Sequence, residues 1–513
     1  EGEAATSGGA EDEAYDEASG VWVREAGKVE CRKLTVMAVP IAITGLIQMA
    51  FTLITLMYVG GISERALAVT GLGTMFYNVT GLSVVLGFSG GLDTFASQFY
   101  GAEQYRLVGV ALQRTLVVCT IITLPIYALW MRTAWLLEQF AIEKELCDDV
   151  QRFVLLLAFH LCPMYVFECT RKWLQCQSLV RPAMFTSAVA IPAHLFCLHL
   201  LVTRDVLGLG FYGAAVALSL SGFWLAGFLI IYIWYSGIWK KCWVIEEGTW
   251  YGWTWECTQH LPEFLKIAAP TAGSVILEWV CFEIVTLFSA QLGETQVAAQ
   301  TVLFNTTACI YVFGLGVAIG ACTRVGNALG ARKPVSAKRA AYVSLLMCAA
   351  MASSIAVSLN WFKVEWVMIY TNDPGVLAAA TLVVPIQASF TVFDCANGVL
   401  AGILRGVGKP TVGLVVCLCS YWLFGLPMGL WMCFTKGYGL SGLWYGLAAG
   451  SVTCACVQGG YISAIDWEEL AQQADDRVQV HKELESNREL DRGMQSASRR
   501  SLADGDPPSG PGR

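Results

Sequence analysis

Two acidic residues, Glu278 and Glu283, lie within an apolar stretch (residues 263–291) that has the length and composition of a membrane-spanning helix. A charged side chain at the centre of a bilayer costs about 2.5–3.5 kcal/mol on insertion scales, so acids there are rare and usually functional. Each carboxyl could hydrogen-bond a neighbouring helix and hold it in place, or at least one could exchange a proton for a cation. We favour exchange, because burial favours the neutral form of a carboxyl and a nearby cation favours the charged form.

The spacing of the two acids separates their roles. Five positions along a helix correspond to a rotation of about 140° and a rise of about 7.5 Å, so Glu278 and Glu283 cannot share one narrow face. Glu278 lies deeper in its stretch. We therefore expect Glu278 to be the exchanging group and Glu283 to be its neighbour.

A third acid, Asp394, falls in the apolar stretch 379–404, and the amide of Asn397 widens this polar patch. The bases of the same half fall at the ends of such stretches: Arg324, Lys363 and Arg405. A cavity lined by carboxylates without bases attracts cations. The sequence therefore predicts a cation-binding site in the second half of the chain.

Aromatic and amide side chains could complete this site. Trp279 and Tyr311 offer aromatic faces to an organic cation, an interaction of about 0.5–2 kcal/mol, although either ring could equally serve packing. The interior of the first half is less acidic, and Gln48 and Asn78 supply neutral polar groups there. We include these four residues among the candidate binding residues.

The chain that carries these residues is far more apolar than a soluble protein. Its 513 residues are 56% hydrophobic and 14% charged, whereas soluble domains are about 25% charged. Its net charge of −7 comes largely from the two ends, so it identifies no partner, and no basic patch of the kind that binds nucleic acid is present. We expect an integral membrane protein in contact with the lipid bilayer.

Apolar stretches of about 20 residues or more follow one another along the chain, separated by short polar breaks. Twelve are expected, near residues 34–59, 66–95, 107–131, 150–172, 183–203, 211–236, 263–291, 297–323, 338–362, 379–404, 411–434 and 441–464. Lys and Arg are enriched in the connections on one side, which include Arg181, Lys240 and Arg332. The positive-inside rule therefore places both termini in the cytosol.

Motifs of the first half recur in the second half at an offset of about 229 residues. The matching pairs are Pro40 and Pro270; Gly91-x-x-Thr94-x-x-x-Gln98-x-x-Gly101-Ala102 and Gly320-x-x-Thr323-x-x-x-Asn327-x-x-Gly330-Ala331; Arg181-Pro182 and Lys409-Pro410; and Gly210-x-x-Gly213 and Gly439-x-x-Gly442. Each half spans the membrane an even number of times, so both halves begin on the same side. They are predicted to be parallel repeats, a plan common among alternating-access transporters.

This symmetry divides the chain into five expected parts. They are a disordered cytosolic amino end (1–32), a first six-helix bundle (33–239), a cytosolic interfacial linker (240–262), a second six-helix bundle (263–465) and a cytosolic polar carboxyl tail (466–513).

Four motifs together resemble the signatures of the multidrug and toxic compound extrusion (MATE) transporters, in their animal-type eukaryotic branch. The motifs are Arg324-Val325-Gly326-Asn327-Ala328-Leu329-Gly330-Ala331, Leu277-Glu278-Trp279-x-x-x-Glu283, Asp93-Thr94-x-x-Ser97-Gln98-x-Tyr100-Gly101 and Leu404-Arg405-Gly406-x-Gly408. The similarity runs from about residue 33 to residue 475.

The resemblance implies an all-α polytopic membrane protein, with twelve transmembrane helices in two parallel six-helix bundles that form a V-shaped cleft. It also implies export of organic cations or other xenobiotics in exchange for protons, with acids at the positions of Glu278, Glu283 and Asp394 binding the cation and the proton. Animal-type members carry a further Glu where this chain has Asn305. We therefore count Asn305 among the candidate site residues.

We predict a transporter and not an enzyme: an antiporter that exports small organic cations for protons, functions as a monomer and needs no cofactor. Its membrane is expected to be the plasma membrane or that of a vacuole or another acidic organelle. The alternatives are a sodium-coupled or organic-anion exporter of the same fold and a polytopic lipid-modifying enzyme. The enzyme is disfavoured because the sequence offers no metal-binding or nucleophile motif on an interior face.

Overall fold

The structure is a computed structural model that describes residues 24–139, 143–203, 208–237, 253 and 255–480. Every regular element in these ranges is a helix, and twelve helical segments among them are long and apolar enough to cross a membrane. The prediction of twelve spans is thereby confirmed. Most of the amino end predicted to be disordered, most of the predicted linker and the last part of the tail lie outside the described residues.

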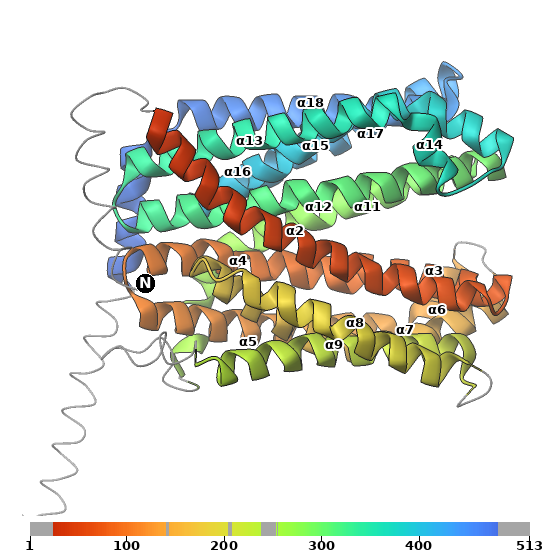
Figure 1. Cartoon of the computed structure of the whole chain (residues 1–513), viewed down its shortest axis with the longest axis horizontal. Coiled ribbons are helices and arrows are strands. Elements are labelled where there is room, and N and C mark those ends of the chain that lie inside the picture. Colours follow the sequence, from red (N-terminus) through yellow and green to blue (C-terminus); the bar gives the residue numbers. More distant parts are fainter. Residues whose placement is uncertain (1–23, 140–142, 204–207, 238–252, 254, 481–513) are drawn as a thin grey trace, which may run out of the picture.

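The first bundle contains six spans, and short helices follow some of them (Figure 1). Its elements are α2 (Arg24–Gly60), α3 (Glu64–Tyr77), the π-helical turn η1 (Asn78–Leu82), α4 (Ser83–Gly101), α5 (Tyr105–Trp130), α6 (Thr133–Glu138), α7 (Lys144–Cys176), α8 (Arg181–Val202) and α9 (Gly210–Tyr235). The segments α3, η1 and α4 form one continuous span.

The second bundle repeats this order after the short 3₁₀ helix η2 (Trp255–Thr258). Its elements are α11 (Leu261–Ala290), α12 (Glu294–Gly330), α13 (Pro334–Trp361), α14 (Lys363–Met368), α15 (Pro374–Gly406), α16 (Pro410–Cys417), η3 (Leu418–Gly425), α17 (Leu426–Leu430), η4 (Trp431–Thr435) and α18 (Gly439–Ala464). The elements from α16 to η4 form one span that includes two π-helical segments.

Side chains at the helix starts explain several of the boundaries. Ser63 caps α3 by accepting a hydrogen bond from the backbone nitrogen of Ala66 (3.1 Å), and Asp373 caps α15 in the same way from Val376 (2.8 Å). Each cap satisfies one of the amide groups that a helix leaves without a partner at its start. Within a bilayer these helices satisfy the remaining backbone groups internally, as the absence of water requires.

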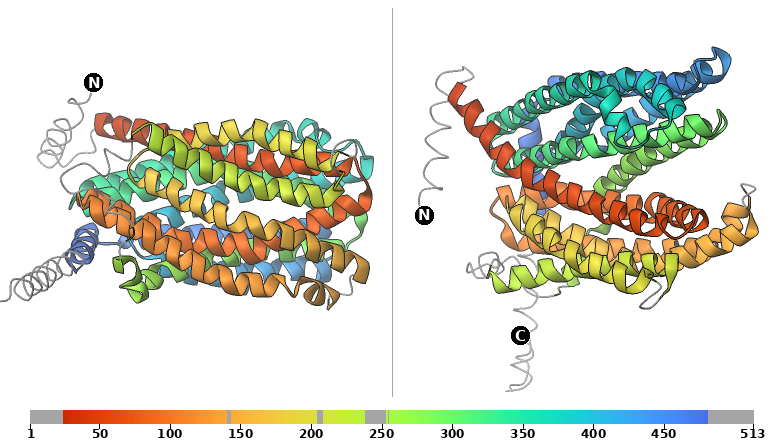
Figure 2. Two further views of the ribbon diagram at one scale, coloured as in Figure 1. Left: turned by 90° about the horizontal axis from the view of Figure 1, so that it is seen from below. Right: turned by 45° about the vertical axis from the view of Figure 1, so that its right-hand side comes forward.

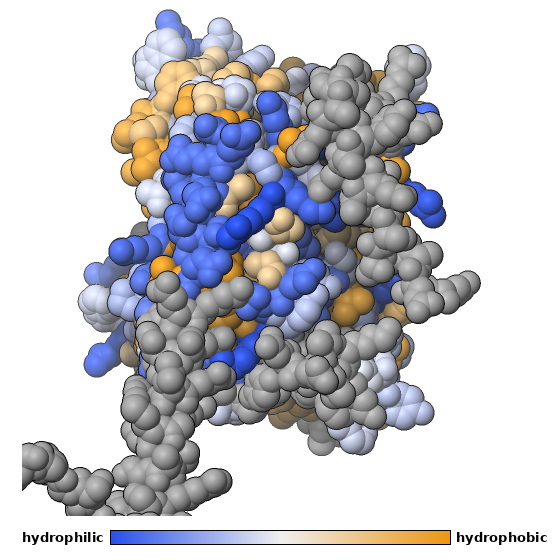
Figure 3. Space-filling model, turned by 90° about the vertical axis from the view of Figure 1, so that its left-hand side faces the viewer, coloured by the Kyte–Doolittle hydropathy of each residue, from blue (hydrophilic) through white to orange (hydrophobic). Residues whose placement is uncertain are grey.

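The outer surface of the helices carries large apolar side chains that are exposed in the isolated chain. Examples are Met57, Leu124, Phe196, Leu382 and Leu423. A soluble protein seldom exposes so many large apolar groups, whereas lipid covers them in a membrane. Hydrophilic side chains instead gather over the middle of one end of the molecule (Figure 3).

We call this end the terminal face, because α2 begins there and α18 ends there (Figure 1). The two bundles lie close together at the terminal face and splay apart toward the opposite face (Figure 2). This arrangement is the predicted V of two parallel six-helix bundles.

Helix α2 belongs to both halves of the V. Its first part packs against α12 of the second bundle, where a Cβ on Gly316 would lie 2.6 Å from the carbonyl oxygen of Ala38. Its later part packs against α8 of the first bundle, where the hydroxyl of Thr55 lies 3.0 Å from Nε2 of His194. Helix α11 makes the symmetric crossing, because its early residues Phe264 and Ala268 belong to the core of the first bundle.

At the terminal face, α4 and α12 meet through the two copies of the repeated motif. A Cβ on Gly101 would overlap the backbone carbonyl of Asn327, and a Cβ on Gly330 would overlap the backbone carbonyl of Gln98. The two contacts are related by the repeat. Only residues without a side chain allow the two backbones to come this close.

The amide side chains of the same motif continue the symmetry. Nε2 of Gln98 donates a hydrogen bond to the carbonyl of Gly406 at the end of α15 (3.0 Å), and Nδ2 of Asn327 donates one to the carbonyl of Cys176 at the end of α7 (3.1 Å). Each bundle therefore satisfies carbonyl groups at a helix end of the other bundle, where no intrahelical partner exists.

A last helix, residues 467–480, crosses the terminal face. Trp467 and Ala474 are buried in the core of the second bundle, whereas Val478 is buried in the core of the first. Asp475 forms an ion pair with Arg332, and Nη2 of Arg477 donates a hydrogen bond to a carbonyl at the end of α15 (3.3 Å). Burial lowers the pKa of Arg477 to about 10, so its guanidinium remains charged at neutral pH.

The substitution Gly101→Ala is expected to lower the melting temperature of the purified protein. The added methyl group must push α4 away from α12, and overpacking of this kind costs about 1–3 kcal/mol. The matched control is Gly459→Ala in α18, where nothing lies within 4 Å of an added Cβ. This control gains helix propensity and should keep or raise the melting temperature. Identical melting temperatures for the two variants would contradict the role given to Gly101.

Candidate functional site

A cavity of about 520 Å³ lies between the two bundles. The first bundle contributes residues of α2, α3, η1, α4, α7 and α9 to its wall, and the second contributes residues of α11, α12, α15, α16, η3 and α18. Much of the wall is apolar, with a few polar groups that converge on the interior, which is the usual composition of a small-molecule site.

Five of the residues predicted from the sequence line this cavity: Gln48, Asn78, Glu278, Trp279 and Tyr311. Glu278 and Trp279 come from α11, and Tyr311 comes from α12. Asn78 begins η1, a π-helical turn of the type that often marks functional positions. The fold therefore brings the candidates of both halves to a single space.

Glu278 differs from the other acids of the cavity wall. Among the described residues it has no hydrogen-bond donor and no ion-pair partner, although its carboxyl lies within the protein. The charged group whose field reaches it is the guanidinium of Arg405. A carboxylate in this position is free to meet a charge that enters the cavity.

Three predicted residues do not line the cavity: Glu283, Asp394 and Asn305. Glu283 lies further along α11, and the side-chain amide of Asn305 donates a hydrogen bond to a carbonyl of its own helix (2.9 Å). Asp394 is only 3% exposed within the second bundle, and its Oδ1 has no hydrogen-bond partner among the described residues. It interacts electrostatically with Glu278.

Asn397 and Tyr421 form the polar wall beside Asp394. The amide nitrogen of Asn397 lies 3.0 Å from both the carbonyl and the hydroxyl oxygen of Ser451 in α18, and 3.3 Å from the hydroxyl of Tyr421. Both Asn397 and Tyr421 line the cavity. Asp394 therefore lies behind the cavity wall, one helical turn from a side chain that forms part of it.

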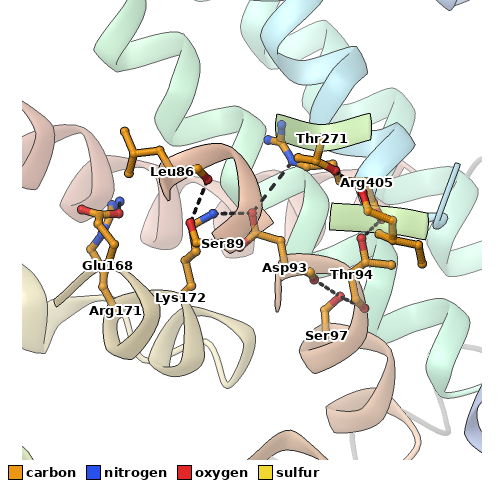
Figure 4. A network of polar contacts seen from close by, with 11 residues as sticks. Leu86, Ser89, Asp93, Thr94, Ser97, Glu168, Arg171, Lys172, Thr271 and Arg405 are labelled. Atoms are coloured by element: carbon orange, nitrogen blue, oxygen red, sulfur yellow. Dashed lines mark hydrogen bonds and ion pairs between the residues drawn. The ribbon is translucent and has the colours of Figure 1, made fainter. Parts of the chain in front are cut away.

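The expectation that bases stay away from the acids was wrong. Three bases line the cavity near the terminal face, together with two acids of the first bundle (Figure 4). These residues are Asp93, Glu168, Arg171, Lys172 and Arg405. Each lies in the last third of a long helix, and the convergence of the bundles at the terminal face brings these helix ends together.

The charges in this group are paired. Nζ of Lys172 lies 2.9 Å from Oδ2 of Asp93, and Glu168 forms an ion pair with Arg171. Nε of Arg405 lies 3.9 Å from the same oxygen of Asp93, which links α15 of the second bundle to α4 of the first. At about 4 Å and an effective dielectric constant of 20, two unit charges attract by about 4 kcal/mol before desolvation.

Neutral side chains extend this charged group toward the first bundle. Nε2 of Gln48 donates a hydrogen bond to Oε1 of Glu168 (3.1 Å), which connects a predicted residue to the group. The hydroxyl of Tyr77 lies 2.8 Å from Nδ1 of His160, and both residues line the cavity. The charged group could have been predicted from the sequence. Its acids and bases all occur near the ends of their spans on the same side of the membrane, so they could meet there.

The described residues offer no group of three or more His, Cys, Asp or Glu side chains that could hold a metal ion. The residues of the cavity are suited to binding and releasing charged molecules.

Comparison with known proteins identifies the family. The sequence matches the MatE family over residues 40–198 and 270–431, which correspond to most of each bundle. It is 32% identical over 461 residues to multidrug and toxin extrusion protein 1 of Rattus norvegicus, covering 89% of this chain and 79% of the relative. It is 30% identical over 459 residues to protein DETOXIFICATION 49 of Arabidopsis thaliana, covering 89% of this chain and 88% of the relative.

Solved structures show the same architecture. The crystal structure of the eukaryotic MATE transporter AtDTX14 superposes with a TM-score of 0.82 at 24% identity, covering 88% of this chain and 100% of the other. The fold agrees with the twelve helices and two bundles described above. This chain is therefore an integral membrane protein of the MATE family, whose members are multidrug and toxin extrusion transporters and not enzymes.

Proposed function

We propose that this protein is a secondary active antiporter that exports organic cations in exchange for protons, with Glu278 as the exchange site. The main observation that supports this proposal concerns the acids of the cavity wall. Among the described residues, Glu278 is the one acid of that wall without a hydrogen bond or ion pair. The other acids of that wall, Asp93 and Glu168, already have bases beside them. The multidrug and toxin extrusion relatives support this class of cargo.

The surroundings of Glu278 suit an organic cation. Trp279 and Tyr311 line the same cavity, and aromatic faces attract cations by about 0.5–2 kcal/mol. The apolar part of the wall accommodates the carbon skeleton of the cargo. Asp394 adds a second acid behind the wall, and its electrostatic interaction with Glu278 couples the protonation of the two groups.

Exchange follows from competition at one carboxylate. Glu278 cannot hold a proton and pair with a cation at the same time, so binding of one releases the other. Transport is coupled if the protein rarely reorients its cavity from one side of the membrane to the other while Glu278 is charged and holds neither a proton nor a cation. Proton entry from one side then releases the cargo there, and cargo entry from the other side releases the proton.

We assign the terminal face to the cytosol. Basic residues such as Arg332, Lys333 and Arg339 follow the helices that end or begin there, as the positive-inside rule requires. The bundles lie close together at this face and splay apart toward the other, so this conformation is closed to the cytosol. We also propose that the protein functions as a monomer, since residues from both bundles of a single chain line the cavity.

The first experiment measures uptake of a labelled organic cation into proteoliposomes under an imposed pH gradient. Glu278→Gln should reduce the gradient-driven uptake by at least about tenfold, because loss of the charge removes both the cation partner and the proton site. The matched control is Glu294→Gln, an exposed acid in the first turn of α12 that does not line the cavity. It should keep normal uptake.

Uptake that ignores both the pH gradient and the Glu278 substitution would rule out this proposal. Two further gradients separate the alternatives. A response to a sodium gradient alone would indicate sodium coupling, and uptake of organic anions in place of cations would indicate an anion exporter.

A second prediction concerns the contact that must open during transport. Asp93→Asn removes the carboxylate shared by Lys172 and Arg405 and should destabilise the protein by about 3–5 kcal/mol, measured by denaturant unfolding in detergent. The control is Glu145→Gln, which removes an exposed partner of Arg65 and should cost less than about 1 kcal/mol. Equal effects of the two substitutions would show that the buried contact contributes little.

A further inference from the structure

Arg405 holds a guanidinium group at the closed end of the cavity. It lies in the last turn of α15, its side chain is 15% exposed, and it lines the cavity wall that also contains Glu278. A guanidinium carries five N–H donors in a planar fork, and that fork matches a carboxylate.

This group is incompletely satisfied. Its Nε is 3.9 Å from Oδ2 of Asp93, which is too long for a hydrogen bond, and the same oxygen accepts from Lys172 at 2.9 Å. The hydroxyl of Thr94 bonds to the backbone carbonyl of Arg405 and not to its side chain (Figure 4). The thiol of Cys322 contacts the guanidinium. Among the described residues, no oxygen accepts a hydrogen bond from it.

Small residues border the guanidinium on the cavity wall. Ala401 lies one turn earlier on α15, and both Ala401 and Gly90 of α4 line the cavity. Gly90 packs closely against Thr271, because an added Cβ would lie 2.4 Å from Cγ2 of Thr271 and 3.8 Å from Cδ of Arg405. The part of the wall next to Arg405 therefore carries no large side chain at these two positions.

We propose that Arg405 binds the carboxylate of a zwitterionic cargo whose cationic group pairs with Glu278. The proposal rests on the exchange role given to Glu278 and adds a class of cargo, organic zwitterions that carry a cationic nitrogen and a carboxylate. Tyr311 lines the same cavity and interacts electrostatically with both Glu278 and Arg405. A cargo with opposite charges at its two ends meets a complementary charge at each end of its binding site.

The test compares two ligands that differ in charge and by one methyl group: a quaternary ammonium carboxylic acid and its methyl ester. Each displaces a labelled organic cation from the purified protein at equilibrium, with no pH gradient. The wild-type protein should bind the acid about tenfold more tightly than the ester, because only the acid offers the guanidinium a charged carboxylate, whereas the ester carbonyl is a weaker, neutral acceptor. Equal affinities, or weaker binding of the acid, would overturn the proposal.

Substitutions assign the effect to one side chain. Arg405→Gln should abolish the preference for the acid over the ester, and it should not weaken binding of the ester, because it removes a positive charge whose field reaches Glu278. If Arg405→Gln does not fold, Arg405→Lys keeps the charge, loses the fork and should lose part of the preference. The control is Lys266→Gln, which removes an exposed charge from α11 outside the cavity. A preference that persists in the Arg405 variants, or that Lys266→Gln removes equally, would refute the assignment.

The outcome for Arg405 is separable from that for Glu278. If the proton-exchange proposal fails, the pH gradient has no effect on uptake, whereas the ratio of acid to ester affinity still reports on Arg405. If only the zwitterion proposal fails, gradient-driven uptake of simple cations persists and the affinity ratio stays near one.

Discussion

The close approach of α4 and α12 at the terminal face is the contact on which the rest of the structure depends. Gly101 and Gly330 allow each helix to reach a backbone carbonyl of the other, and Gln98 and Asn327 then reach helix-end carbonyls across the bundles. Because the two bundles meet here and splay elsewhere, the cavity has a closed end. The charged side chains that lie at this end, including Asp93 and Arg405, are desolvated by the same contact. Their pairing across the two bundles is therefore a consequence of glycine packing.

The cavity combines two acids that have bases beside them with one acid that has none among the described residues. Glu168 and Asp93 have bases beside them and act as parts of the scaffold, whereas Glu278 faces the same space without a partner. A protein interior tolerates an unpaired carboxyl only at a cost, because burial penalises the charged form. In the cycle proposed above, the proton or the cargo repeatedly removes that cost. The aromatic residues Trp279 and Tyr311 line the same space and add apolar surface to its wall.

The sequence predicted the fold and one acid that lines the cavity, Glu278, but it did not predict the arrangement of the charges. Apolar length identified the twelve spans, and the cost of a carboxyl in an apolar helix identified Glu278. Repeated motifs also indicated that the two halves are parallel repeats. The position of Arg405 could not be predicted in this way. A base at the end of a span is usually interpreted as an anchor at the membrane surface. Only the packing of α15 against α4 makes Arg405 part of the cavity wall. Asp394 is the opposite case. It lies within a span, as an acid of the cavity wall was expected to, but its side chain is buried behind that wall.

In the transport cycle proposed above, the helix of residues 467–480 affects the balance between a conformation that is closed at the terminal face and one that is open there. Trp467 and Val478 are buried in different bundles, so opening the terminal face must expose at least one of them to water. Full exposure of one such side chain costs about 1.5–3 kcal/mol, which changes the ratio of two populations roughly ten- to a hundredfold. In this cycle, a segment that contacts neither cargo nor proton therefore sets part of the ratio between the closed and open conformations. The same segment thus influences how often the cavity opens at the terminal face.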